Sequence, residues 1–270
     1  MTRGYLVLAQ GDYVKQAEAL ACSIKQTQTT VNKISIITDG NPDADLFDHV
    51  IKLKLDISGD STWKIHNRVQ FYDLTPYDET VILDADMLFL TDVGHWWTHM
   101  STYDLLLTSQ VLTYRGETVQ YSPYRQTFVN NQLPNVYSAF AYFKKTDFSK
   151  VFFDLLKSII MNWDTWIEQH APLTPQTFPS LDLAMALAVK ILNCESAVTS
   201  KRNYPTFVHM KSGCQGWPSY SENWTEELNI FTRNNKLLLG DHVQSGVLHY
   251  VKKDFASQEL LKELYENRLL

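Results

Sequence analysis

The chain has 270 residues, of which 44% are hydrophobic and 20% are charged, and its formal net charge is −6. A chain of this length can bury a sizeable core within one large domain, and its ordinary composition excludes a disordered or low-complexity protein. The negative charge excludes a general attraction to nucleic acids or anionic membranes and leaves room only for a local basic patch.

Strand-like and helix-like patterns alternate through the first third of the chain. Apolar runs predict strands over residues 4–9, 33–38 and 49–55 and from residue 81 onward, whereas apolar residues at helical spacing predict helices over 13–26 and 61–74. This alternation predicts an α/β fold, in which a mostly parallel sheet carries helices on both faces.

Regularity decreases beyond residue 100. We expect strands over 103–109 and 136–143, helices over 148–163 and 184–191, and a last helix over 257–270. Three irregular stretches lie between them, at 110–135, 163–179 and 201–224, and they are rich in aromatic and polar residues. Loops of this length are usually functional or mobile.

Two features bear on the cellular compartment. The first apolar run, from Tyr5 to Ala9, is too short for a signal-peptide core and far too short to span a bilayer. The three cysteines are odd in number and widely spaced, which argues against a disulfide framework and against a zinc site. We therefore expect a cytoplasmic protein with no transmembrane segment.

Two carboxylates, Asp84 and Asp86, interrupt the apolar run that extends from Val81 to Leu90. Charged groups near a core are costly unless they are paired, hydrogen-bonded or bound to a cation. If residues 81–83 form a central strand, the pair lies at its carboxyl end, where open α/β sheets bind their ligands. The pattern indicates a divalent cation site, and the alternative is a strand that simply ends in an Asp-capped turn.

Several further motifs follow one another in a characteristic order. They are Leu6-Val7-Leu8-Ala9 with Tyr13-Val14-Lys15, Ser58-Gly59-Asp60-Ser61 with Lys64, the Asp84 and Asp86 pair, Tyr137-Ser138-Ala139, Pro179-Ser180-Leu181-Asp182-Leu183, and Val247-Leu248-His249-Tyr250 followed by Lys252 and Lys253. Over residues 4–253 this order resembles the family 8 glycosyltransferases, which are retaining enzymes of the GT-A fold and include glycogenin and bacterial galactosyl- and glucosyltransferases.

The resemblance implies a single GT-A domain over residues 1–270, with a Rossmann-like, mixed, mostly parallel sheet. Residues 1–109 would bind a nucleotide sugar, residues 110–256 would form an irregular acceptor side and complete the metal site, and 257–270 would be a C-terminal helix. That helix is expected to dock on the domain or on a second copy in a homodimer.

The resemblance also assigns roles to residues of the nucleotide and metal sites. Leu8, Ala9 and Tyr13 would contact the nucleotide, with Tyr13 stacked on the base, and Lys64 would reach a phosphate or the sugar. A metal ion would be held by Asp84, Asp86 and His249, and the donor would also be contacted by Asp84 and Ala85. The mixed oxygen and nitrogen ligands suit Mn²⁺, whereas Mg²⁺ would retain more water.

The sugar and diphosphate sites are implied in the same way. Ser138 would lie in the turn that approaches the sugar, but Tyr137 and Ala139 depart from the usual Asn-Ser-Gly of the family, which leaves the identity of the sugar open. Asp182 would contact the reacting sugar, although it also suits the first turn of a helix. Either Lys252 or Lys253 would hold the diphosphate.

The function implied is metal-dependent, retaining transfer of a sugar from a nucleoside-diphosphate sugar, with UDP-sugars favoured, to a hydroxyl group of a glycan or protein. Front-side attack and double displacement both remain open. The alternatives are transfer to a hydroxylated DNA base of a viral genome, metal-dependent nucleotidyl transfer, and nucleotide-sugar binding without catalysis. Residues considered for the acceptor are Tyr114, Arg115, Tyr121, Tyr124, Arg125, Trp163, Trp166, Trp217 and Trp224, and a basic set considered for phosphate is Lys201, Arg202, Lys211, Arg233, Lys236, Lys252 and Lys253.

Overall fold

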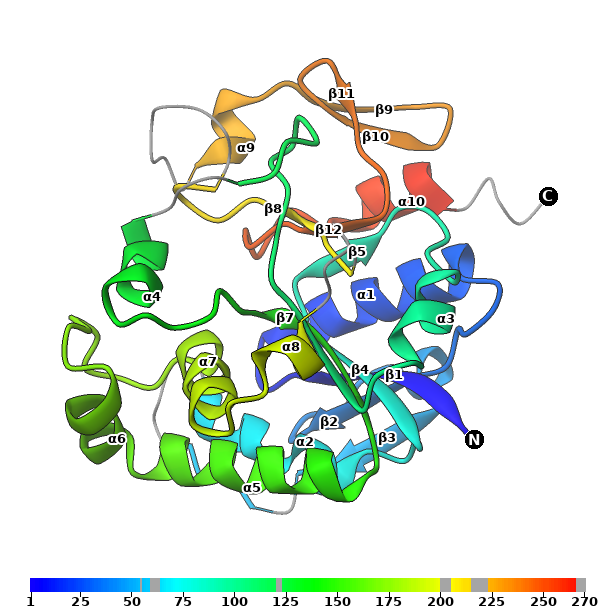
Figure 1. Cartoon of the computed structure of the whole chain (residues 1–270). Helices are drawn as coiled ribbons and strands as arrows, with labels where there is room; N and C mark the ends of the chain where they lie inside the picture. The colour runs from blue at the N-terminus through cyan, green and yellow to red at the C-terminus, as the bar shows by residue number, and fades with distance from the viewer. Residues whose placement is uncertain (54, 59–63, 120–122, 200–204, 215–222, 266–270) are drawn as a thin grey trace.

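The computed structural model describes residues 1–53, 55–58, 64–119, 123–199, 205–214 and 223–265 (Figure 1). Several sequence predictions fall outside these ranges. They are Gly59, Asp60 and Ser61 of the motif before Lys64, the start of the predicted 61–74 helix, Tyr121, Lys201, Arg202, Trp217 and residues 266–270.

A six-stranded sheet forms the centre of the molecule, with strand order β3-β2-β1-β4-β7-β6. The strands are β1 (Arg3–Leu8), β2 (Ile34–Thr38), β3 (His49–Lys52), β4 (Glu79–Leu83), β6 (Leu105–Thr108) and β7 (Tyr137–Lys144). The first four strands run parallel, and β7 pairs antiparallel with both β4 and β6. The predicted mixed, mostly parallel sheet is therefore confirmed.

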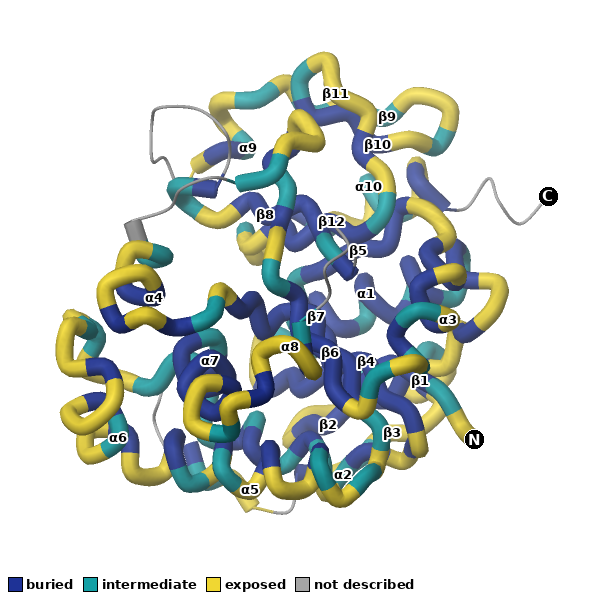
Figure 2. The backbone as a smooth tube through the Cα atoms, in the orientation of Figure 1, coloured by how far each residue is buried: buried dark blue, intermediate teal, exposed yellow. Residues whose placement is uncertain are grey.

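Helices cover both faces of this sheet (Figure 1). Successive residues of a strand point to opposite faces, so Tyr5 and Val7 of β1 pack with α1 (Tyr13–Thr27) and α3 (Trp96–Met100). Leu6 and Leu8 belong to the core on the other face, which is built with α5 (Asp147–Met161) and α7 (Leu181–Ile191). β2 and β4 are buried along their whole length, which explains why neighbouring residues on both faces are apolar, such as Ile36 and Ile37 in β2 and Val81 to Leu83 in β4 (Figure 2).

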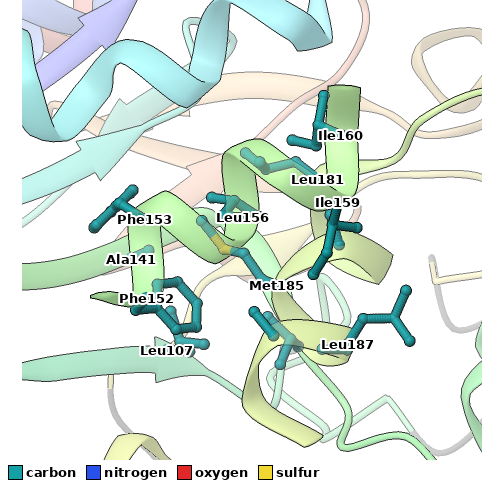
Figure 3. Close-up of a cluster of buried hydrophobic side chains, with 14 of the residues drawn as sticks. Leu107, Ala141, Phe152, Phe153, Leu156, Ile159, Ile160, Leu181, Met185 and Leu187 are labelled. Carbon is teal, nitrogen blue, oxygen red and sulfur yellow. The ribbon is translucent and has the colours of Figure 1, made fainter. Parts of the chain in front are cut away.

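The second core contains α5 and α7 packed against each other and against the sheet. Figure 3 shows Phe152 and Leu156 of α5 and Met185 of α7 gathered beside Leu107 of β6 and Ala141 of β7. All five side chains are at most 1% exposed. This packing fixes the position of α7, whose first turn carries Asp182.

A smaller sheet lies beside α1, in the order β5-β12-β8. Its strands are β5 (Met87–Phe89), β12 (Val247–His249) and β8 (Val208–His209), of which β12 runs antiparallel to β5 and parallel to β8. The apolar run from Val81 to Leu90 is therefore divided between two sheets, and the two aspartates lie at the break. α10 (Gln258–Tyr265) packs against the same core as this sheet.

A third sheet, β11-β10-β9, was not predicted. Its strands β9 (Ile230–Arg233), β10 (Lys236–Leu239) and β11 (His242–Val243) are antiparallel, and α9 (Trp224–Glu227) precedes them. Asn234 and Asn235 join β9 to β10 with φ angles of 53° and 57°. A two-residue turn of this kind favours a hairpin, so the Asn pair was the signal available in the sequence.

Short helices interrupt the stretches that were predicted to be irregular. The 110–135 stretch contains η3 (Pro123–Arg125) and α4 (Gln126–Asn130), and the 163–179 stretch contains α6 (Trp163–His170). Elsewhere, η1 (Ala44–Leu46) and α8 (Glu195–Val198) are further short helices that were not predicted. The described part of the predicted 61–74 helix is η2 (Ile65–Gln70) followed by α2 (Phe71–Leu74). Helices this short show too few turns for their periodicity to be recognised.

None of the helices in the described ranges combines the length and apolar character needed to cross a bilayer.

Candidate active site

A cleft of about 550 Å³ opens at the carboxyl ends of β1 and β4. This edge is where open α/β sheets bind ligands. The predicted site residues that line it are Leu8, Tyr13, Lys64, Asp84, Ala85, Asp86, Ser138, Asp182 and His249. The structure thus brings together residues from six separate sequence motifs.

Asp84, Asp86 and His249 converge because of two strand pairings. The Asp84 amide donates to the carbonyl of Ala139, which continues the β4 and β7 ladder by one residue. The Tyr250 amide donates to the Asp86 carbonyl across β5 and β12, where His249 is paired with Met87. One side-chain ligand atom from each of the three residues lies within 4.8 Å of the others.

The charges of this group are mutually compensated. His249 Nε2 lies 3.0 Å from Asp86 Oδ1 and 3.9 Å from Asp84 Oδ2, and Arg68 donates to Asp84 Oδ1. Burial favours a higher pKa for Asp86, but the charge and hydrogen bond of His249 together with the charge of Arg68 lower the pKa of this carboxyl below its usual value. Burial favours a lower pKa for His249, but the charge and hydrogen bond of Asp86 together with the charge of Asp84 raise the pKa of this imidazole.

The donor set fits a divalent cation. Nε2 of His249 faces the two carboxylates, while its buried Nδ1 has no hydrogen-bond partner among the described residues. Two carboxylates and one imidazole suit Mn²⁺, and Mg²⁺ would bind through the oxygen atoms with more water.

Asp182 lies on another wall of the cleft and is held by three hydrogen bonds. Its Oδ1 accepts from the amide and the hydroxyl of Ser138, at 2.8 and 2.6 Å, and its Oδ2 accepts from Arg125 Nη2 at 2.5 Å. The Arg125 guanidinium also lies 3.6 Å from the centre of the Tyr137 ring. Burial favours a higher pKa for Asp182, but Arg125 and Ser138 together have the larger effect and lower the pKa below its usual value. The carboxyl is therefore held as an anion.

A polar network supports the nucleotide side of the cleft. Asn67, which is fully buried, donates to Gln10 Oε1 at 2.6 Å and to Asp56 Oδ1 at 2.8 Å. Lys64 Nζ lies 3.3 Å from Asp56 Oδ2. Lys64 itself adopts a left-handed backbone with φ of 49°, which directs the chain from this network into η2.

This network should make the stability of the folded protein depend on pH in the acid range. The hydrogen bond from Asn67, with smaller contributions from Ser58 and Lys64, lowers the pKa of Asp56 from 3.8 to about 2. A carboxyl with a lowered pKa stabilises the fold above its unfolded pKa and loses that contribution as the pH falls toward its folded pKa. We expect Asp56→Asn to lose less stability than the wild type between pH 3.8 and about 2. Urea unfolding at several pH values measures this, and equal losses in both proteins would contradict it.

Three predicted residues do not line the cleft within the described part of the chain. Ala9 is buried, Lys252 Nζ lies 3.0 Å from Asn223 Oδ1, and Lys253 Nζ lies 4.6 Å from the Tyr13 ring centre. Of the residues considered for the acceptor, Tyr124 lines the cleft, whereas Trp224 is 1% exposed and belongs to the core around α9 and α10.

Arg68, Phe207 and His209 lie outside the motifs that predicted the site, and Lys211 was only one of several basic residues considered for phosphate. All four line the cleft. Phe207, His209 and Lys211 are alternate residues along and beyond β8, so a period of two was the signal available. No comparable signal marks Arg68, because it lies in η2, whose 3₁₀ turns repeat differently from an α-helix.

No protein-family model matches the sequence, and no curated protein matches it either. The structure is similar to the glycosyltransferase GlyE of Streptococcus pneumoniae TIGR4, with 12% identity and a TM-score of 0.52, over 100% of this chain and 61% of that one. It is also similar to the bifunctional glycosyltransferase WbbM, with 12% identity and a TM-score of 0.53, over 92% of this chain and 45% of that one. It is also similar to the galactosyltransferase LgtC, whose structure contains donor and acceptor sugar analogs. The identity is 12% and the TM-score is 0.50, over 92% of this chain and 86% of that one.

These likenesses show that the chain has the GT-A fold of glycosyltransferases, as the sequence resemblance predicted. The chain spans about three fifths of GlyE and less than half of WbbM.

Proposed function

We propose that the protein is a metal-dependent glycosyltransferase similar to the family 8 enzymes, which moves a sugar from a nucleoside-diphosphate sugar to a hydroxyl acceptor. UDP-sugars are the favoured donors. The observation that carries the proposal is the convergence of Asp84, Asp86 and His249 within 4.8 Å, in the cleft at the carboxyl ends of β1 and β4 of a GT-A fold.

Asp84, Asp86 and His249 would hold Mn²⁺ or Mg²⁺ in this proposal. The bound cation would neutralise the charge that develops on the departing diphosphate. Arg68 donates to Asp84 and orients its carboxylate toward the site. An orientation that is fixed before the substrate binds reduces the cost of assembling the site.

The walls of the cleft supply the remaining contacts with the donor. Leu8, Tyr13 and Lys64 line the cleft. In this proposal Tyr13 would stack on the nucleobase beside Leu8, and Lys64 would approach the phosphate or sugar. Ser138 and Asp182 would contact the sugar itself. Because both oxygens of Asp182 already accept hydrogen bonds, its charge is suited to stabilising positive charge at the anomeric carbon and is poorly suited to nucleophilic attack.

These contacts support front-side attack with retention of configuration. In that scheme the acceptor hydroxyl approaches from the side of the departing diphosphate, and no protein nucleophile is needed. We propose a glycan or protein hydroxyl as the acceptor. Tyr124 and the 52% exposed Phe178 line the cleft and offer aromatic surfaces for such a ligand.

Nucleotidyl transfer is less well supported. A triphosphate site of that kind needs a glycine-rich or basic loop after the first strand. The connection from β1 to α1 consists of residues 9–12, with the sequence Ala-Gln-Gly-Asp, and contains no basic residue.

Calorimetric titration tests the proposed function. A panel of nucleoside diphosphates and their sugars is titrated into the protein with Mn²⁺, with Mg²⁺ or with EDTA. We expect one nucleotide series to bind, with an affinity that falls when EDTA removes the metal. Metal-independent binding, or no binding by any member of the panel, would contradict the proposal.

A further inference from the structure

One wall of the cleft is formed by three alternate residues, Phe207, His209 and Lys211. β8 pairs in parallel with β12 so that His209 lies opposite His249. The two imidazole rings are stacked, with centroids 4.7 Å apart and an interplanar angle of 24°. His209 of β8, with Phe207 before the strand and Lys211 after it, therefore lines the cleft beside the metal-binding group.

Lys211 differs from Arg68 and Lys64, the other basic residues that line the cleft, because those two are each paired with a carboxylate. Arg68 is paired with Asp84, and Lys64 is paired with Asp56. Behind the wall, Arg125 is paired with Asp182. Lys211 forms no ion pair within the described ranges, and its Nζ lies 4.9 Å from the ring centre of Tyr124. The positive charge of Lys211 is therefore available to a ligand.

His209 provides an independent indication of a ligand. His209 lines the cleft and is 6% exposed. Its buried Nδ1 atom has no hydrogen-bond partner in the part of the chain that the structure describes. Buried polar atoms are normally satisfied, because an unpaired one costs free energy. A polar ligand that entered this side of the cleft would offset that cost.

We propose that Lys211 and His209 form an anion-binding subsite beside the metal-binding group. Its ligand would be a phosphoryl or carboxylate group, carried either by the donor diphosphate or by the acceptor. The first source rests on the proposed function and moves the diphosphate contact from Lys252 or Lys253 to Lys211, which follows β8. Lys252 and Lys253 do not line the cleft, whereas Lys211 does.

The test compares the wild type with Lys211→Met, with UDP and inorganic pyrophosphate as probes, by calorimetry in the presence of Mn²⁺. Lys236→Met is the matched control, since Lys236 is an exposed lysine of β10 and does not line the cleft. A charge-assisted contact is among the stronger hydrogen bonds. We expect Lys211→Met to lower the affinity for UDP and for pyrophosphate by about tenfold or more. Uridine binding should remain unchanged, because uridine has no phosphate.

His209→Phe is a second variant that retains a ring stacked on His249. We expect this variant also to bind UDP and pyrophosphate more weakly, while its affinity for Mn²⁺ remains unchanged. Loss of Mn²⁺ binding together with normal pyrophosphate affinity would assign His209 to support of His249 and would overturn its place in the subsite.

The two sources of the anion are separated by a titration with glucose 6-phosphate after the protein has been saturated with UDP and Mn²⁺. Normal UDP affinity in Lys211→Met, with loss of glucose 6-phosphate binding, would assign the subsite to the acceptor. The subsite is overturned if Lys211→Met binds every probe as the wild type does, or if only Lys252→Met or Lys253→Met weakens binding.

The same titrations distinguish this proposal from the proposed function. Lys211-dependent binding of pyrophosphate, in a protein that binds no nucleotide, would retain the anion subsite and contradict the glycosyltransferase. Metal-dependent nucleotide binding that is insensitive to Lys211→Met and His209→Phe would support the glycosyltransferase and contradict the anion subsite.

Discussion

Replacing Asp86 with Asn is expected to lower the affinity of the protein for Mn²⁺ by more than about 100-fold. Loss of an outer-shell partner of a metal ligand already costs roughly 10- to 100-fold in affinity, and a direct ligand contributes more. Asn keeps the shape of the side chain but removes one of the two carboxylate charges. The structure offers His249 and Asp84 as the remaining ligands, with Asp84 already engaged by Arg68.

Mn²⁺ binding to the wild type and to Asp86→Asn is measured by electron paramagnetic resonance of the free ion. Asp12→Asn is the matched control, because Asp12 is an exposed acid just before α1 and does not line the cleft. We expect the control to bind Mn²⁺ as the wild type does. Equal binding by all three proteins would show that the three converging side chains do not form the metal site.

Arg125→Met is expected to destabilise the folded protein by about 3 kcal/mol. The side chains of Arg125 and Asp182 are 11% and 19% exposed, so the substitution leaves a carboxylate largely buried without its cationic partner. The variant also loses the hydrogen bond from Arg125 to the Val136 carbonyl and the contact of the guanidinium with Tyr137. Met was chosen because it retains much of the apolar volume of Arg.

A double-mutant cycle isolates the ion pair from these other losses. Urea unfolding is measured for Arg125→Met, Asp182→Asn and the double variant. Because Asp182→Asn removes the charge that Arg125→Met leaves unpaired, the double variant should be more stable than the sum of the single effects, by roughly 1–3 kcal/mol. Additive effects would contradict a direct role for the pair in holding the wall of the cleft.

The sequence predicted the central sheet well. The strands β1, β2 and β4 are buried almost throughout and each carries a group of apolar residues, as expected for strands covered on both faces. It did not predict the short helices such as α4 and α9, nor the sheet of β9, β10 and β11. α4 and α9 have five and four residues, so neither shows a full second turn of amphipathic spacing.

The candidate metal group was also accessible from the sequence. Asp84 and Asp86 are conspicuous because they interrupt an apolar run, and His249 was added through the resemblance to a known family. The structure brings the three together, although 163 residues separate Asp86 from His249. The roles assigned to them remain predictions until metal binding is measured.

What the sequence by itself determined is therefore local: the buried strands, the main helices and the acidic pair at the end of β4 all follow from patterns within a few residues of one another. Which charges balance within the cleft was decided by the tertiary structure. The pairing of Arg68 with Asp84 and of Arg125 with Asp182, and the position of Lys211 rather than Lys252 or Lys253 on the cleft wall, depend on contacts between distant segments. Such contacts form only when sheet registers and helix packing are fixed, because a shift of one residue in β8 or β12 would turn their side chains to the opposite face.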